Sequence, residues 1–118
     1  MSEIRVTTVS DTAGTGPVTL TKQEAAKHWV NFDGTGTVAI RDSLNAASLV
    51  DGGTGVYTIN YTNAMGNTTY AVQNHDISYG NGWAESLATT SYITRRRNES
   101  AAYLDVASIW GLVHGDLA

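Results

Sequence analysis

The stretch from His28 to Tyr61 alternates between apolar and polar residues in three short runs, which two glycine-rich turns separate. Because neighbouring side chains on a strand point to opposite faces, this alternation predicts strands with one buried face. In the first run, Val30 and Phe32 share one face. Trp29 and Asn31 take the other face. The pattern therefore predicts the start of a small antiparallel sheet.

A glycine-rich turn joins the first two runs. Residues 33–36 read Asp-Gly-Thr-Gly, and these residue types tolerate the positive φ of tight turns. The alternation resumes in residues 37–42, where Val38 and Ile40 are expected to point inward. Two alternating runs around a short glycine turn predict a β-hairpin.

A second glycine cluster, residues 51–55, turns the chain into the third run. Residues 43–50 alternate poorly, so we expect an irregular link between the second run and this turn. Residues 56–61 alternate again and are expected to form a strand. The apolar row of this strand consists of Tyr57, Ile59 and Tyr61.

The second half of the chain has weaker strand patterns. Residues 70–74 predict a strand, and residues 76–83 are expected to form an irregular loop rich in aromatic residues. Strand character returns at residues 91–94 and is expected to end in a charged turn, residues 95–99.

The last apolar run, residues 101–113, is expected to be a long and well-buried closing strand. Its inward row would be Leu104, Val106, Trp110 and Leu112. The chain then holds about seven strands, spaced by roughly ten to fifteen residues. This spacing predicts an all-β fold, a single small antiparallel β-sandwich or jelly-roll-like module.

Residues 1–20 have too few apolar side chains to fold alone, and we expect an extended N-terminal arm. Such an arm gains order by adding to a neighbour's sheet edge or by threading between subunits, because buried backbone groups need partners. A first strand of the same domain is the alternative. The candidate docking side chains of the arm are Ile4, Val6, Val9, Val18 and Leu20.

A short helical spacer is expected at residues 21–27. Thr21 and Glu24 have the spacing of a capping box, in which each side chain satisfies a backbone amide of the other residue. The predicted organisation is therefore an arm at residues 1–20, this spacer, and a β-sandwich domain at residues 28–118.

The composition agrees with a β module and excludes several classes of protein. Of the 118 residues, 15% are charged and one is proline, which favours short strands and polar turns. The formal charge of −4 gives no general attraction to phosphate backbones, so direct nucleic-acid binding is disfavoured. The chain has no cysteine. Without disulfides, oligomerisation is the natural way to stabilise so small a domain.

No apolar run approaches the ~20 residues that span a bilayer, so no membrane insertion is expected. Residues 1–23 lack the basic start and hydrophobic centre of a signal peptide. We therefore expect the protein to be made and kept in a cytoplasm until another component carries it.

The sequence contains no recognisable catalytic or metal-binding motif. The three histidines, His28, His75 and His114, are far apart and lack the spacing of metal ligands. No G-x-S-x-G elbow marks a nucleophile, and the glycine clusters lack the frame of a phosphate-binding loop. We therefore expect no enzymatic activity, no catalytic or metal site and no cofactor.

Two groups of residues are candidates for binding. Tyr79, Asn81 and Trp83 lie in a glycine-bearing loop, where aromatic faces and an amide suit stacking on a sugar. The same residues suit packing against another subunit. Arg95, Arg96 and Arg97 form the one basic run, which offers charges for contacts between subunits or with a phosphate. A solvated hairpin tip is the ordinary reading of that run.

A family resemblance rests on residues 27–65. This segment carries a tryptophan, a V-N-F strand with a glycine turn, a V-A-I-R-D-S strand and a D-x-G-T-G-x-Y-T-x-N strand. Here these are Trp29, Val30 to Gly36, Val38 to Ser43 and Asp51 to Asn60. The set closely resembles a segment common in bacteriophage and prophage virion proteins, especially tail-fibre-like ones. The N-terminal residues also resemble the short lead-in of such proteins, whereas the second half agrees with them in general style alone.

The resemblance implies a structural protein of the phage virion, assembled in the bacterial host cytoplasm. Its expected form is a tail-fibre-like homotrimer that docks on other virion proteins of the tail or capsid through the N-terminal arm. A capsid decoration (cement) protein is the alternative within the same class. A carbohydrate-binding module for host surface glycans, with an aromatic platform at Tyr79 and Trp83, is the alternative of another class.

Overall fold

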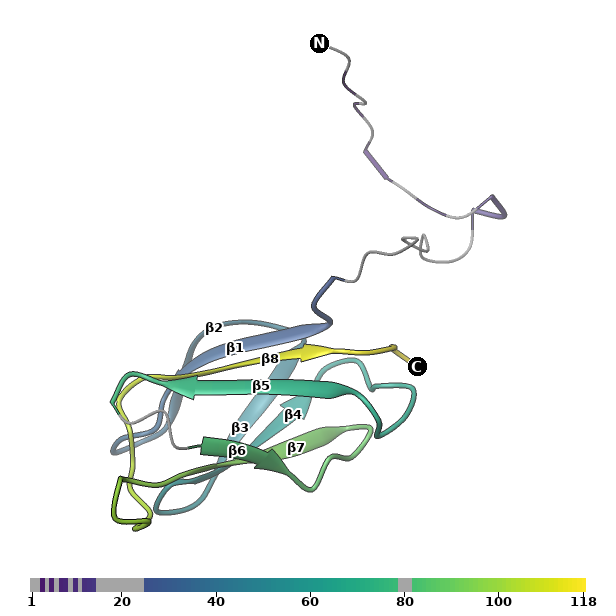
Figure 1. The fold of residues 1–118 in the computed structure, drawn as a ribbon. Helices are drawn as coiled ribbons and strands as arrows, with labels where there is room; N and C mark the ends of the chain where they lie inside the picture. Colours follow the sequence, from purple (N-terminus) through teal and green to yellow (C-terminus); the bar gives the residue numbers. More distant parts are fainter. Residues whose placement is uncertain are drawn as a thin grey trace.

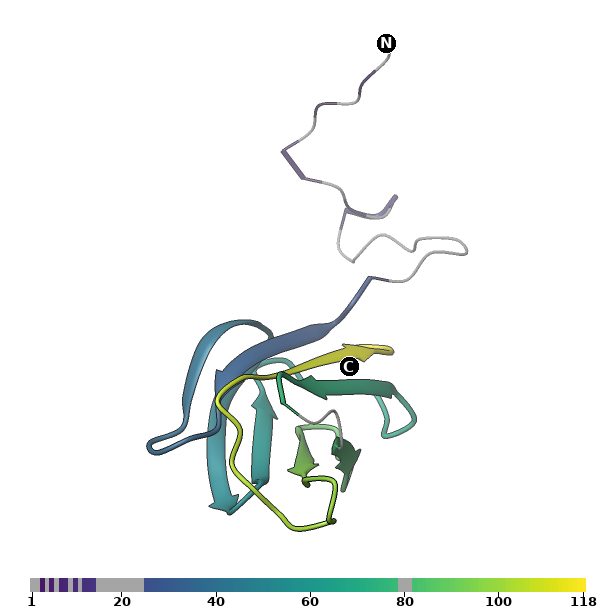
Figure 2. The ribbon, with the colours of Figure 1, turned by 60° about the vertical axis from the view of Figure 1, so that its left-hand side comes forward.

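The computed structural model describes residues 3, 5, 7–8, 10, 12–14, 25–78 and 82–118. In this part of the chain the fold is all-β, without a helix, and consists of two antiparallel sheets of four strands each. The sheets face each other, as Figures 1 and 2 show. The predicted sandwich-like fold is confirmed. The described strands number eight rather than about seven.

Sheet I has the strand order β2-β1-β8-β5. Its strands are β1 (His28–Asp33), β2 (Ala39–Leu44), β5 (Ala71–Asp76) and β8 (Ile109–His114). Sheet II has the order β3-β4-β7-β6. Its strands are β3 (Ala46–Gly53), β4 (Val56–Tyr61), β6 (Gly82–Glu85) and β7 (Ser91–Arg96).

The predicted hairpin is β1 and β2, which pair antiparallel around the glycine turn. Val30 and Phe32 are buried, as the alternation indicates, and Ile40 of β2 packs against the core to which they belong. Gly34 is required in this turn because a Cβ there would lie 2.4 Å from the Tyr57 hydroxyl. The apolar row predicted for β4 is also confirmed, since Tyr57, Ile59 and Tyr61 are all buried.

The link expected at residues 43–50 is wrong. Strand β2 continues to Leu44, Asn45 turns the corner with a φ of 57°, and β3 begins at Ala46. The strand pairs with β4 through two irregular positions, between Ala46 and Ser48 and between Asp51 and Gly53. These shifts, together with the exposure of most of this edge strand, remove the regular alternation that would have marked it.

The long closing strand expected at residues 101–113 is also wrong. Strand β8 covers the last part of it, and its buried residues are Ile109, Gly111 and Val113, whereas Trp110 and Leu112 point outward. Gly111 faces the core, and a larger residue does not fit there because its Cβ would lie 2.6 Å from the Tyr92 hydroxyl. The buried row thus contains a glycine and the outer row contains the larger side chains, which reverses the face that hydrophobicity predicts.

The expected loop and charged turn of the second half are shorter than predicted. Residues 79–81 lie outside the described residues, and residues 82–85 form β6. Strand β7 extends two residues beyond Thr94, so Arg95 and Arg96 belong to the strand. The charged turn therefore begins at Arg97, which forms an isolated bridge with Tyr103.

The predicted docking side chains of the arm and the capping-box residues Thr21 and Glu24 lie outside the described residues. The described residues among 1–20 are all exposed. Of the spacer, residues 25–27 are described and are not helical. The Lys27 amide donates to the Val113 carbonyl at 2.8 Å, so this part of the chain extends sheet I.

A buried ion pair joins the two sheets. Arg96 of β7 and Asp76 of β5 are 0% and 1% exposed, and Arg96 Nη1 lies 3.3 Å from Asp76 Oδ2. Arg96 Nη2 also donates to Thr94 Oγ1 at 3.2 Å. Gly82 leaves room for the guanidinium, because a Cβ at that position would lie 1.7 Å from Arg96 Nη1. Burial lowers the pKa of Arg96, and the charge of Asp76 opposes this effect.

We predict that Asp76→Asn lowers the free energy of unfolding by about 3–5 kcal/mol, because it leaves the buried Arg96 without its counter-charge. The asparagine has the same shape and keeps the oxygen that accepts from the Ser78 amide. Urea denaturation measures the change. Asp116→Asn, at an exposed aspartate, is the matched control and is expected to have little effect. Equal stability of Asp76→Asn and the wild type would contradict the role given to this pair.

Candidate functional site

The outer side of sheet II carries a cluster of aromatic and charged side chains that we call the aromatic–arginine patch. Trp83 and Glu85 point outward from β6, and Trp83 lies directly opposite Arg95 of β7. Arg97 follows on the same side of the chain. The patch consists of Trp83, Glu85, Arg95, Arg97 and Tyr103.

Arg97 is held above two aromatic rings. Its Cζ lies 4.5 Å from the ring centroid of Trp83 and 4.9 Å from that of Tyr103, and the two centroids are 6.4 Å apart. Arg97 Nη2 donates to the Tyr103 hydroxyl at 3.1 Å. Cation–π contacts of this kind fix the plane of the guanidinium.

The two arginines differ in their partners. Arg95 forms an ion pair with Glu85, whose other carboxylate oxygen accepts from Trp83 Nε1 at 3.1 Å. Hydrogen bonds from Arg95 and Trp83 lower the pKa of Glu85. Arg97 has no carboxylate partner among the described residues, and its hydrogen bond lowers the pKa of Tyr103. The charge of Arg97 also contributes to the lowered pKa of Glu85, so the described patch contains two cations and one acid.

Trp83, Arg95 and Arg97, which the sequence proposed as two separate sites, are thus brought together. Arg96 is not part of the cluster. The reading of all three arginines as a surface group, available for contacts between subunits, is wrong for Arg96, because alternation along β7 turns it into the core. Tyr79 and Asn81 lie outside the described residues. The sequence gives no signal for Tyr103, because residues 101–113 predict one continuous closing strand.

The outer side of sheet I carries a different surface, which we call the tryptophan face. Strand pairing places its side chains in two rows. The first row is Leu44, Trp29, Leu112 and Gln73, and the second is Asp42, Asn31, Trp110 and His75. Leu44 is 48% exposed, and both tryptophans and Leu112 are partly exposed. No described segment lies over this side of β1 and β8 in Figures 1 and 2.

The corresponding outer rows of sheet II are more polar. The row that crosses the middle of β3, β4 and β7 is Val50, Thr58 and Ile93, and it ends at Glu85 of β6. The neighbouring row is Ser48, Asn60 and Ser91. The central rows of the two sheets therefore differ, and the tryptophan face is the more apolar of the two.

The three histidines are not gathered in one place. His75 lies against Trp110 on the tryptophan face, with ring centroids 5.4 Å apart, and His114 pairs with Ala71 at the other end of β5. His28 is fully buried between the sheets. Its Nε2 lies 3.2 Å from the Tyr92 hydroxyl and its Nδ1 lies 3.1 Å from the Asn45 carbonyl oxygen. Burial lowers the pKa of His28.

Within residues 25–78, 82–118 and the few described positions before them, no group of three or more histidine, cysteine or acidic residues could hold a metal ion. The same residues include no helix with the length and hydropathy needed to cross a membrane. Comparisons with models of protein families, with curated proteins and with solved structures found no match.

We predict that the protein loses stability as the pH falls below about 6.5, the ordinary pKa of histidine. The unfolded chain then binds a proton at His28, whereas the folded protein binds it at a lower pH. The free energy of unfolding therefore decreases through this interval, by at most about 1.4 kcal/mol per pH unit. The pKa values of Asp33 and Glu85 are lowered from 3.8 and 4.5, so protonation of these carboxylates reduces the stability of the folded protein only at lower pH.

Urea denaturation at pH 7.5, 6.0 and 5.0 tests this dependence. His28→Gln is expected to abolish most of it, and His114→Gln, at a partly exposed histidine, is the matched control. An identical pH dependence in His28→Gln and the wild type would show that another group is responsible.

Proposed function

We propose that this chain is a structural subunit of a phage virion, of the tail-fibre-like kind. It assembles as a homotrimer whose subunits meet on the tryptophan face. Residues 1–20 dock on other proteins of the particle. The resemblance of residues 27–65 to virion proteins supports the assignment to a phage particle and the trimeric state. The geometry of sheet I supports self-association.

The tryptophan face is the observation that carries the proposal. Six-residue strands about 20 Å long, spaced about 4.8 Å apart, give a four-stranded face of roughly 400 Å². The apolar side chains cover part of this face, beside Asp42, Asn31, Gln73 and His75. The largest apolar patch on a monomer, typically about 300–600 Å², is often a functional site. Leu44, Trp29 and Leu112 are adjacent in one row without a charge between them. Aromatic enrichment and depletion of charge are typical of the central part of a protein interface.

A second copy of the same chain is the partner that this surface fits best. The domain is small and has no cysteine, so burial between subunits supplies the stability that disulfides would otherwise give. The row of Leu44, Trp29, Leu112 and Gln73 also lacks the charges that steer an acidic chain to an unlike, basic partner.

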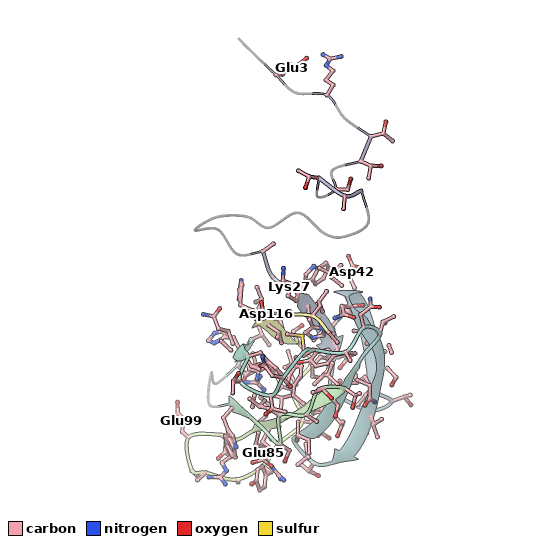
Figure 3. The ribbon with its side chains drawn as sticks, turned by 90° about the vertical axis from the view of Figure 1, so that its right-hand side faces the viewer. Glu3, Lys27, Asp42, Glu85, Glu99 and Asp116 are labelled. Atoms are coloured by element: carbon pink, nitrogen blue, oxygen red, sulfur yellow. The ribbon has the colours of Figure 1, made fainter. Side chains whose placement is uncertain are left out.

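The two sides of the sandwich agree with a subunit that is anchored on one side. Lys27, where the chain enters sheet I, lies on the same side of the sandwich as Asp116, whereas Glu85 and Glu99 lie on the opposite side (Figure 3). Glu85 belongs to the aromatic–arginine patch. A subunit held through the residues before Lys27 would therefore present this patch away from its attachment.

Light scattering during size-exclusion chromatography tests the assembly. We predict a mass three times that of the 12.5 kDa chain. A monomer would contradict the self-standing trimer and would favour a decoration subunit that is ordered by its partner on the particle.

We predict that Leu112→Lys dissociates the trimer, because the lysine charge would be buried at the centre of the tryptophan face. The loss of about 2 kcal/mol or more at a central interface residue raises the dissociation constant more than tenfold. Val50→Lys is the matched control, since Val50 is 49% exposed on the outer side of sheet II. Circular dichroism checks that both variants fold. A Leu112→Lys protein that remains trimeric would place the interface elsewhere.

A further inference from the structure

The sequence contains two Asp-Gly pairs, Asp33–Gly34 and Asp51–Gly52. Such a pair is prone to rearrange without an enzyme, because glycine has no side chain to shield its amide nitrogen from the preceding carboxyl group. The two pairs also share their local geometry. In each, the aspartate Oδ1 accepts from the backbone amide two residues further on, at 2.8 Å in the first pair and 2.9 Å in the second. A difference in reactivity between them must therefore come from the surrounding fold.

The fold protects the first pair. Gly34 is buried, and its amide donates to the Val106 carbonyl at 2.9 Å, so the nitrogen is held in place. The carboxyl group of Asp33 is held in its ionised form, because hydrogen bonds from Thr35 lower its pKa and Arg41 Nη2 lies 3.5 Å from its Oδ2. An ionised carboxylate does not lose an oxygen as water. Both reacting groups of this pair are therefore restrained.

The second pair lies open at the tip of the hairpin formed by β3 and β4. Asp51 and Gly52 are both exposed, and Gly52 falls in the irregular step of the pairing between these strands. A Cβ at Gly52 would come no closer than 3.2 Å to its nearest neighbour, a methyl group of Val56. No lysine or arginine in the described part of the chain forms an ion pair with Asp51. The contacts that protect the first pair are therefore missing here.

We infer that Asp51–Gly52 is a site of spontaneous covalent modification, at which the folded protein converts Asp51 to isoaspartate while Asp33–Gly34 persists. The Gly52 nitrogen attacks Cγ of Asp51, and a carboxyl oxygen leaves as water with the amide proton and the carboxyl proton. The product is a cyclic succinimide, which water then opens. Cleavage of the bond between the Gly52 nitrogen and the main-chain carbonyl carbon gives isoaspartate, whereas cleavage of the new bond restores aspartate. Water is the only co-reactant, and the mass of the chain does not change.

The modification alters the end of an edge strand. Isoaspartate adds a carbon atom to the main chain beside the regular pair of Asp51 and Tyr57. The Asp51 side chain that accepts from the Gly53 amide becomes part of the main chain, so this hydrogen bond is lost. The tip of the hairpin therefore loses its pairing as the protein ages. Because β3 belongs to sheet II, the tryptophan face is not altered, and the inference does not depend on the proposed function.

Incubation of the full-length protein at pH 6.5 and 37 °C, followed by digestion with trypsin and mass spectrometry, tests the inference. Trypsin cleaves after Lys27 and Arg41, so the two pairs fall in different peptides. Electron-transfer fragmentation locates isoaspartate by the additional carbon in its main chain. Asn81, which also precedes a glycine, lies in the same peptide as Asp51, but its deamidation changes the mass and is therefore distinguished.

We expect isoaspartate to form at least about tenfold faster at Asp51 than at Asp33 in the folded protein, because Asp33 reacts only after its surroundings open. In concentrated urea the two positions are expected to react at similar rates. Similar rates in the folded protein, or isoaspartate at Asp51 in urea alone, would overturn the inference. A preference of the same size in urea would assign the difference to local sequence and would overturn it as well.

Gly52→Ala places a methyl group beside the attacking nitrogen and is expected to slow the formation of isoaspartate at Asp51 several-fold. Thr54→Ala, at another exposed residue of the same hairpin tip, is the matched control and is expected to leave the rate unchanged. Circular dichroism checks that both variants fold. An equal rate in Gly52→Ala and the wild type would contradict the attack by this amide. A monomeric wild type would contradict the proposed function but not this site.

Discussion

The arrangement of the two sheets depends on polar groups that are buried between them. Arg96 of β7 pairs with Asp76 of β5, and the Tyr57 hydroxyl of β4 donates at 2.8 Å to the carbonyl of Gly34 in the turn after β1. His28 of β1 contacts a tyrosine hydroxyl of β7 in the same way. An unpaired buried polar group costs about 1–3 kcal/mol, so a shift of one sheet against the other would break several of these contacts at once. These buried polar contacts therefore fix the position of one sheet relative to the other, in addition to the exclusion of water from the interior.

This interior also decides which side chains are left outside. Because Gly111 makes room for Tyr92, the large residues of β8 point outward, and Trp110 and Leu112 come to lie beside Trp29. Because Arg96 points inward, its neighbours Arg95 and Arg97 point outward, beside the ring of Trp83. The apolar outer surface of sheet I and the cationic, aromatic patch of sheet II are thus two consequences of one core. We propose that the first of these surfaces serves self-association.

The sequence predicts the first half of the fold better than the second. Regular alternation identifies β1 and β4, because each of these strands has one buried and one partly exposed side. The glycine turn identifies β2, which pairs with β1 but has no fully buried residue. The edge strand β3 is mostly exposed and irregularly paired, so it has no period to detect. In β8 the inward row contains a glycine, and the large hydrophobic residues Trp110 and Leu112 lie in the outer row, so the hydrophobic pattern predicts the wrong buried face. The sequence predicts the candidate site in part, because it indicates Trp83 and the arginine run as two separate sites. Their proximity and the role of Tyr103 depend on pairing between β6 and β7 and on a bridge in a loop, which local sequence does not encode.

The central claim is that the tryptophan face is covered by further copies of the chain, and acrylamide quenching of tryptophan fluorescence tests it most directly. The chain has three tryptophans, and Trp83→Phe leaves two, Trp29 and Trp110, both on this face. Our account predicts weak quenching in the assembled Trp83→Phe protein and clearly stronger quenching when Leu112→Lys is added. Equal quenching of the two proteins, at a concentration where light scattering shows the first to be assembled, would mean that the face is open to solvent and that the subunits meet elsewhere.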